Sequence, residues 1–281
     1  MTAGETAREG VEAASKGGAS RAVMARCGLV ARGLMYVVIG VLAVRVAFGE
    51  SGGGGGGGEE ADRTGALQEL VEKPFGGVLV WAVGFGLICM TLWRLSEAVL
   101  GAAGPDGDKV GKRLAAAGRA LFYGVVASSV LSFAAGSGGG QSGDEQSRDV
   151  TARALEVPGG PWWVAAAGVG VAVGGVVIAV QAARRSFRQH LSMDRQPEGV
   201  RIAVEVLGVV GGVARGAVFA SAGAFVVHAA VSYDPAKAKG VDDTLRTFAQ
   251  TPAGPWLLAA VATGLVLFGL FSWAMACWRR V

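Results

Sequence analysis

The chain has 281 residues, of which 52% are hydrophobic and 17% charged, and its mean hydropathy is +0.45. Soluble proteins usually have about a quarter of their residues charged, so this composition excludes an ordinary soluble domain. The net charge of +4 does not indicate a nucleic-acid partner, because the basic residues have almost no aromatic residues between them.

Six apolar segments are each long enough to cross a bilayer, which takes about 20 residues in a helix. They cover residues 28–48, 76–100, 114–135, 161–181, 202–231 and 254–278. The pattern predicts an all-α integral membrane protein with six transmembrane helices. Residues 1–24 are charged and lack an apolar core, so they predict a disordered cytoplasmic tail rather than a signal peptide.

Charge divides the segments outside these spans into two sets. The first set holds fourteen Lys or Arg and seven acidic residues, and comprises residues 1–27, 101–113, 182–201 and 279–281. The second set holds seven Lys or Arg and thirteen acidic residues, and comprises residues 49–75, 136–160 and 232–253. Basic residues accumulate on the cytoplasmic side of membrane proteins. We therefore expect a plasma-membrane protein with both termini in the cytoplasm and three acidic loops outside.

The spans repeat in pairs. An arginine occurs at the same point of three spans, at Arg32, Arg119 and Arg215, with offsets of 87 and 96 residues. A Pro-x-Gly sequence precedes each of the other three spans and fits the same alignment. The pattern predicts three tandem two-helix hairpins, all inserted the same way up, in a pseudo-threefold arrangement. The hairpins comprise residues 25–104, 105–190 and 191–281.

A short stretch before the second span of each hairpin has apolar residues at helical spacing. Residues 64–76 and 241–254 each predict a short amphipathic helix at the external interface. The corresponding stretch in the second hairpin, at 150–160, predicts a shortened helix.

Arginine inside a span is costly to bury, so the three repeated arginines need an explanation. Each lies 16 residues before the external end of its span. At 1.5 Å per residue this is about 24 Å, which leaves the Cα about 6 Å inside the cytoplasmic edge of the bilayer core. The first interpretation is that these side chains snorkel to lipid phosphates. The second is that Arg32, Arg119 and Arg215 form a ring that binds a small anion or an anionic lipid headgroup.

Other charged residues inside the spans predict local interactions. Arg45 and Arg94 are expected to be snorkelling anchors or members of local ion pairs. Glu97 lies one helical turn after Arg94, which favours a pair within that helix. No rule selects a partner for Glu205.

Glycines at four-residue spacing predict close contacts between helices in lipid. Gly208, Gly212 and Gly216 form the longest such series, in the fifth span. We expect it to serve internal packing first and dimerisation second. Gly170 and Gly174 form a shorter series in the fourth span.

Few residues could support catalysis or bind a metal. The chain has two histidines, and its three cysteines lack metal-binding spacing. His228 and Ser232 lie one helical turn apart near Asp234, but a serine hydrolase also needs an oxyanion hole, for which no motif is present. We therefore expect no catalytic residue, no metal and no cofactor.

The first hairpin carries three sequences that resemble a known family. They are RCGLVARGLMYVVIGVLA at 26–43, TGAL with PFG at 64–76, and GLICMTLWRLSEA at 86–98, with weaker copies later in the chain. This pattern resembles the actinobacterial membrane family catalogued as domain of unknown function 1206. The resemblance implies an actinobacterial plasma-membrane protein with six spans, and it implies no activity.

These observations favour a non-enzymatic component of the cell envelope. Its expected partners are membrane lipids, including anionic headgroups, and either a second copy of the chain or another envelope protein. The alternative is a transporter or channel for anions or small solutes, with the three arginines lining a central site. An intramembrane enzyme is the third hypothesis.

Overall fold

The computed structural model describes residues 3–48, 63–101, 109–136, 143–193, 196–239, 241–249 and 254–279. Apart from one isolated bridge between Leu191 and Arg279, the regular structure in these residues is helical. The helices are α1 (Ala3–Ala47), α2 (Arg63–Val71), α3 (Gly76–Leu100), α4 (Val110–Ala134), α5 (Gly143–Glu156), α6 (Gly160–Ala183), η1 (Ser186–His190), α7 (Glu198–Ser232), η2 (Pro235–Lys237), α8 (Val241–Ala249) and α9 (Gly254–Trp278).

Six of these helices are long and apolar enough to cross a membrane, and they are α1, α3, α4, α6, α7 and α9. The fold is therefore all-α with six membrane-spanning helices, as predicted. Within α1 the membrane-spanning part runs from Ser20 to Ala47. The other five spans agree with the predicted bounds to within four residues at each end.

The N-terminal segment differs from its prediction. Residues 3–24, which the sequence predicts to be disordered, form the first turns of α1, whose 45 residues make one continuous helix. The segment has six alanines and no proline, which favour a helix, and four glycines, which oppose it.

Each repeat consists of a span, a short helix and a second span, in the order α1–α2–α3, α4–α5–α6 and α7–α8–α9. The predicted short helices in the first and third repeats are present, with nine residues each. The prediction of a shortened helix in the second repeat was wrong, because α5 has 14 residues. The first turns of α5 are polar, so the spacing of apolar residues in the sequence does not indicate that they are helical.

The Pro-x-Gly sequence places a glycine where a short helix turns into the following span. The amide of Gly76 donates to the carbonyl of Lys73 at 2.8 Å, and the amide of Gly160 donates to the carbonyl of Val157 at 2.7 Å. The residue before each glycine has a positive φ, 63° in one turn and 74° in the other. A Cβ on either glycine would collide with the last carbonyls of the short helix. The glycine is therefore required by a close approach of two backbones.

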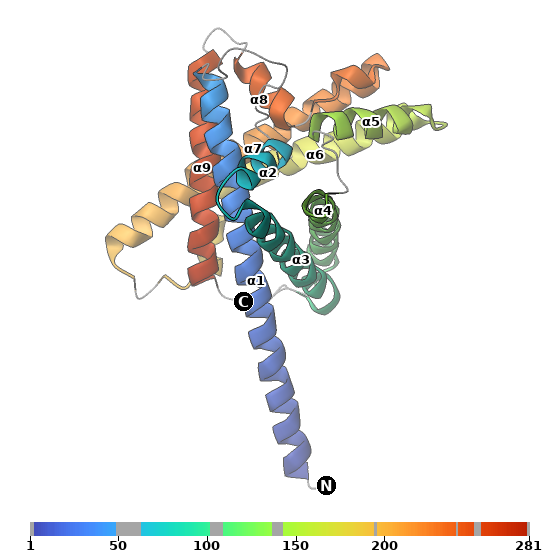
Figure 1. Ribbon diagram of the computed structural model, residues 1–281. Coiled ribbons are helices and arrows are strands. Elements are labelled where there is room, and N and C mark those ends of the chain that lie inside the picture. The colour runs from blue at the N-terminus through green and yellow to red at the C-terminus, as the bar shows by residue number, and fades with distance from the viewer. Residues whose placement is uncertain are drawn as a thin grey trace.

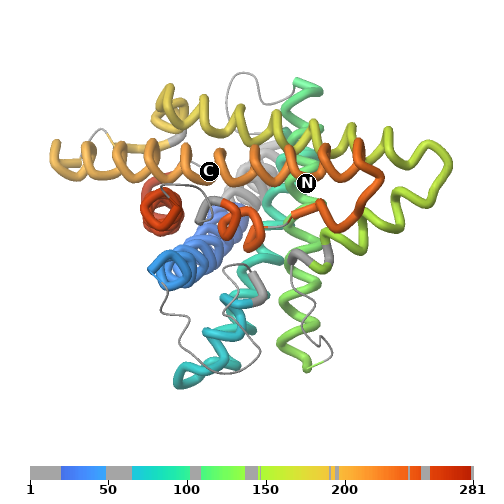
Figure 2. The backbone as a smooth tube through the Cα atoms, turned by 90° about the horizontal axis from the view of Figure 1, so that it is seen from above, coloured from blue at the N-terminus to red at the C-terminus, as the bar shows by residue number. Residues whose placement is uncertain are grey.

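Among the described residues, interfaces between neighbouring helices connect the six spans in a ring that is open between α4 and α6. Helix α1 packs on α3, α3 on α4, α6 on α7, and α7 on α9, which returns to α1. Helix α1 pairs with α9, α3 with α4, and α6 with α7. Figures 1 and 2 show that these pairs run in different directions and cross one another. The residues described for α4 and α6 form no comparable interface, although both helices belong to the second repeat. A pseudo-threefold arrangement requires this sixth interface as well, so it stays a prediction.

Glycines of α7 allow two neighbouring helices to come close. A Cβ on Gly212 would collide with Ala182 of α6, and a Cβ on Gly216 would lie 2.6 Å from the carbonyl oxygen of Gly175. Gly208 instead faces the rings of Phe187 and Phe271. All three glycines thus lie in contacts within the chain.

The glycines that α6 uses are not the ones that the spacing predicts. Gly168 and Gly175 lie against the backbone of α7, whereas a Cβ added to Gly170 or Gly174 would meet no heavy atom within 4 Å. Two positions that differ by seven residues lie on one side of a helix, and the intervening pair lies on another. The expected role of Gly170 and Gly174 in helix packing is therefore absent among the described residues of this chain.

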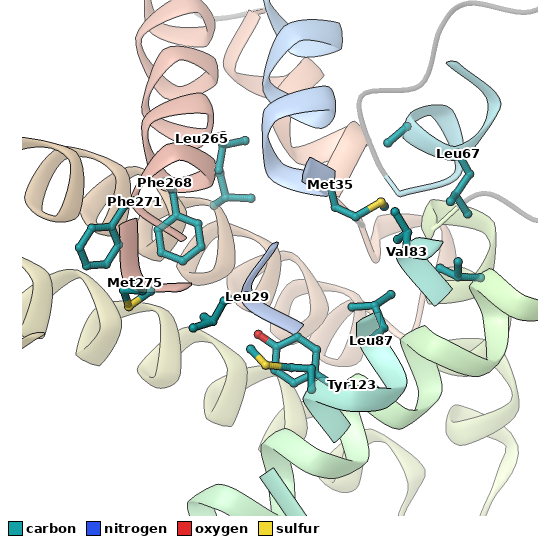
Figure 3. Packing of buried hydrophobic residues seen from close by; sticks show 14 of the residues in the cluster. Leu29, Met35, Leu67, Val83, Leu87, Tyr123, Leu265, Phe268, Phe271 and Met275 are labelled. Carbon is teal, nitrogen blue, oxygen red and sulfur yellow. The ribbon is translucent and has the colours of Figure 1, made fainter. Parts of the chain in front are cut away.

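The apolar core lies where α1 meets α3, α4 and α9. Leu29 of α1 is completely buried there. Figure 3 shows Phe268 of α9 and Tyr123 of α4 on opposite sides of it. The same region holds the charged residues described next.

Candidate functional site

Five arginines lie close together inside the bundle, and we call them the arginine cluster. They are Arg32 of α1, Arg94 of α3, Arg119 of α4, Arg215 of α7, and Arg279 directly after α9. Each lies within electrostatic reach of at least two others, and Glu97 of α3 lies within reach of the same group. The spanning helix that does not contribute an arginine is α6.

Four arginines of the cluster occupy corresponding positions along their helices. Arg32, Arg119 and Arg215 lie 15 to 17 residues before the ends of their helices, and Arg94 lies 18 residues after the start of α3, which runs in the opposite direction. At 1.5 Å per residue each arginine lies about 23–27 Å along its own helix from the helix end that adjoins the short helix of its repeat. The arginines are therefore near the opposite end, where both α3 and α9 finish.

Arg32 is held inside the core by α9. Arg32 is only 6% exposed, and its Nε donates to the hydroxyl oxygen of Ser272 at 3.2 Å. The Ser272 hydroxyl in turn donates to the carbonyl of Phe268 at 2.9 Å. The snorkelling interpretation is therefore wrong for Arg32, because its side chain is fixed by a neighbouring helix.

Arg215 approaches the same part of α9 from α7. Its Nε donates to the Tyr36 hydroxyl at 2.8 Å. The Cζ atoms of Arg215 and Arg32 lie 4.9 Å and 5.1 Å from the centroid of the Phe268 ring. The π-electrons of one phenylalanine thus attract two guanidinium groups, each by a cation–π interaction.

A second aromatic ring also receives two cations. The Cζ atoms of Arg94 and Arg279 lie 4.1 Å and 4.6 Å from the Trp93 ring. Arg94 forms the predicted ion pair with Glu97, at 2.6 Å. Burial, reinforced by the positive charge of Arg94, lowers the pKa of Arg279 to about 9. Burial is the main cause of the lowered pKa, and the positive charges of Arg32 and Arg119 add to the effect of Arg94.

Arg119 is the exposed member of the cluster. It lies within electrostatic reach of Arg94 and Arg215, and also of Tyr123, which is one turn further along α4. Tyr123 is buried and lies within reach of Arg32 as well. Arg119 therefore connects the enclosed part of the cluster with the surface of α4.

Several nitrogen atoms of the cluster have no partner. Among the described residues, the buried nitrogens without a hydrogen bond include Nη2 of Arg32, Nε of Arg94 and Nε of Arg279. A buried donor without a partner costs about 1–3 kcal/mol, and more on a charged group. In the part of the chain that the structure describes, the five arginines share one glutamate, so the arrangement is suited to an additional anion.

The sequence identified part of this cluster. The repeat pattern singled out Arg32, Arg119 and Arg215, and the structure brings them together. It missed Arg94 as a member because the ion pair with Glu97 seemed a sufficient explanation. It also missed Arg279, which follows the last span and looked like an ordinary basic flank. The two hydroxyl partners, Tyr36 and Ser272, gave no signal above other polar residues of apolar helices.

The remaining candidates lie elsewhere. Glu205 pairs with Arg188 at 2.9 Å and with Arg185 at 3.4 Å, both from the connection after α6. Arg45 pairs with Glu69 of α2 at 3.5 Å. His228 is exposed, and Asp234 accepts the amide of Ala236 at the start of η2.

Comparison with known proteins places these repeats in a family. The chain is similar to an uncharacterised Bacillus subtilis protein, YxxB, with 28% identity over 249 residues, which are 88% of this chain and 87% of the relative. No solved structure matches significantly. The family described as Domain of Unknown Function (DUF1206) matches three times, at residues 27–101, 114–185 and 210–279. The actinobacterial origin implied by the resemblance stays a prediction. Because these matches coincide with the three span–short helix–span units and cover most of the chain, the protein belongs to the DUF1206 family.

Proposed function

We propose that this protein is a non-enzymatic component of the plasma membrane that binds a phosphate-bearing anion at the arginine cluster. The observation that carries the proposal is the set of unpartnered nitrogens on Arg32, Arg94 and Arg279, in a group with one carboxylate among the described residues. The bound anion is either a lipid headgroup or a free phosphate, since both present the same oxygens.

Arginine is well suited to this ligand. Its planar guanidinium donates two parallel hydrogen bonds to a phosphate and stays charged in a partly buried site. The aromatic rings of Phe268 and Trp93 hold four of the five guanidiniums in place without using their N–H groups. The unpartnered donors, Nη2 of Arg32 and Nε of Arg94 and Arg279, therefore remain available to a ligand.

The orientation of the protein in the membrane determines on which side the proposed site lies. The charge distribution outside the spans favours cytoplasmic termini. In that orientation the arginine cluster lies nearer the cytoplasmic side of the bilayer than the external side. The proposed partners are therefore anionic groups of that leaflet or of the cytoplasm.

The proposal is tested by titrating the full-length protein, purified in a neutral detergent, with inorganic phosphate. Binding is measured by calorimetry and by the rise in unfolding temperature. Arg32→Gln removes a charged donor, and we expect it to weaken binding about tenfold or more, since such a hydrogen bond contributes about 1.5–3 kcal/mol.

Arg45→Gln is the matched control, because Arg45 also lies in α1 but pairs with Glu69 outside the cluster. It should leave the affinity unchanged. Phosphate binding that is absent, or that is equally affected by both substitutions, would refute the proposal. Phosphate flux in proteoliposomes, measured in parallel, decides whether the protein holds the anion or transports it.

A further inference from the structure

The break between α4 and α6 determines how a ligand reaches the arginine cluster. Arg119 projects from α4, whose buried face packs on α3 through Ala116, Ala120 and Ala127. An open groove of about 500 Å³ lies along one flank of this contact, and Leu95 and Leu121 are among the residues that line it. Arg119 lies on the opposite flank, because it is within reach of Arg215 of α7. Arg119 and Phe122 are both exposed there, and the described residues of α6 form no comparable interface with α4.

The same flank becomes apolar immediately beyond the arginine. Phe122 follows Arg119 by three residues, close to one helical turn, and is 49% exposed. Phe122 lies further along α4 than Arg119, toward the end of α4 that leads into the short helix α5. An exposed cationic group, followed along the same flank by an exposed aromatic ring, matches an amphiphilic ligand.

The other approach to the cluster, from the end of α9, is occupied by the chain itself. The connection after α6 is held there by the amide of Ser192, which donates to the carbonyl of Trp278 at 2.8 Å, and by the bridge between Leu191 and Arg279. The ring of Phe187 in this connection lies against Phe271 of α9 at 4.8 Å. These contacts favour entry from the side.

We infer that the ligand of the arginine cluster is the headgroup of an anionic phospholipid, which enters laterally between α4 and α6. The inference rests on the proposed function and specifies its ligand. Arg119 meets the phosphate at the surface of α4, and the unpartnered donors of Arg32 and Arg94 bind it further in. The acyl chains remain in the bilayer beside Phe122.

The test uses the full-length protein in vesicles that contain a zwitterionic and an anionic phospholipid. A photoreactive phenylalanine analogue at position 122 cross-links the lipids beside the proposed entrance. The same analogue at position 95, in the groove on the other flank, reports the bulk lipid composition. We expect the anionic lipid to be enriched about fivefold at position 122 over position 95, which is the effect of about one cationic contact with anionic lipid.

Arg119→Gln should abolish this enrichment, and Arg119→Lys should retain part of it. Because Arg119 is exposed, neither substitution removes core packing. Equal lipid ratios at both positions, or enrichment that survives Arg119→Gln, would overturn the inference. If inorganic phosphate then still binds in an Arg32-dependent manner, the proposed function stands with a soluble anion as its ligand. If that binding is absent too, both proposals fail.

Discussion

Arg32 and Arg215 illustrate how this protein keeps charge inside an apolar bundle. Each guanidinium has one hydrogen bond to a hydroxyl group, from Ser272 or Tyr36, and both lie near the ring of Phe268. These contacts replace part of the hydration that a charged group loses on burial. They leave Nη2 of Arg32 without a hydrogen bond. A buried arginine with only a structural role usually has all its donors paired.

Ser272→Ala is expected to destabilise the protein, because the Nε of Arg32 then loses its partner. A buried donor left unpaired costs about 1–3 kcal/mol. The free energy of unfolding, measured by denaturant titration in mild detergent, checks the value. Thr263→Ala is the control, since Thr263 lies on the same helix and is exposed. Equal stability of the two variants would show that the contact between Arg32 and Ser272 contributes nothing.

At the scale of helices, the contact between α6 and α7 depends on which residues are small. A Cβ on Gly216 would lie 2.6 Å from the carbonyl oxygen of Gly175, and a Cβ on Gly223 would collide with the backbone nitrogen of Ala172 of α6. Without a hydrophobic driving force between helices in lipid, such close packing is a main source of association. The free-energy cost of replacing a glycine by alanine therefore depends on which face of the helix the glycine lies on.

Gly216→Ala should destabilise the protein by about 1–3 kcal/mol, because the added methyl group overpacks the contact with α6. Gly174→Ala, on an open face of α6, should be neutral or stabilise by up to about 1 kcal/mol through the lower entropy of the unfolded chain. Unfolding free energies of the two variants provide the comparison. A neutral Gly216→Ala would contradict the packing described for α6 and α7.

The sequence predicted the spans far better than it predicted their contacts. Hydropathy and length determine which segments enter the membrane, so α3 and α9 begin and end at the predicted residues. The choice of neighbours depends on the fit of individual side chains, and hydropathy carries no information about that fit. For the same reason, four-residue spacing selected Gly170 and Gly174, whereas α6 packs through Gly168 and Gly175.

At the scale of the whole molecule, the arginine cluster is a product of the tertiary fold. Its members come from α1, α3, α4, α7 and the residue after α9, so no single hairpin contains the site. The repeated arginines could be predicted because they recur in register. Arg94 and Arg279 could not, since their proximity follows from the way α3 and α9 both end beside Trp93.

Anion binding by the cluster should depend on pH. The pKa of Arg279 is lowered to about 9, so its side chain is protonated at pH 7 and loses its charge as the pH rises through 9. Arg94, Glu97, Arg32 and Arg119 are the charged groups within its reach. Because the protonated form attracts the anion, affinity should fall by up to about tenfold above pH 9.

The measurement uses an anionic phospholipid whose phosphodiester keeps a single charge between pH 7 and 10. Arg279→Gln should bind more weakly at pH 7 and show little change between pH 8 and 10. An affinity of the unmodified protein that stays constant over this range would contradict the assignment to Arg279.

The pairing of α1 with α9 has a consequence for biosynthesis. Arg32 and Ser272 are 240 residues apart, and the indole of Trp273 donates to the carbonyl of Val30 across the same interface. Helix α1 leaves the ribosome before α9, and four other spans are synthesised between them. Until α9 is inserted, α1 must therefore remain in the bilayer without the Ser272 partner of Arg32, and the interface between these two helices forms only after the four intervening spans have been made.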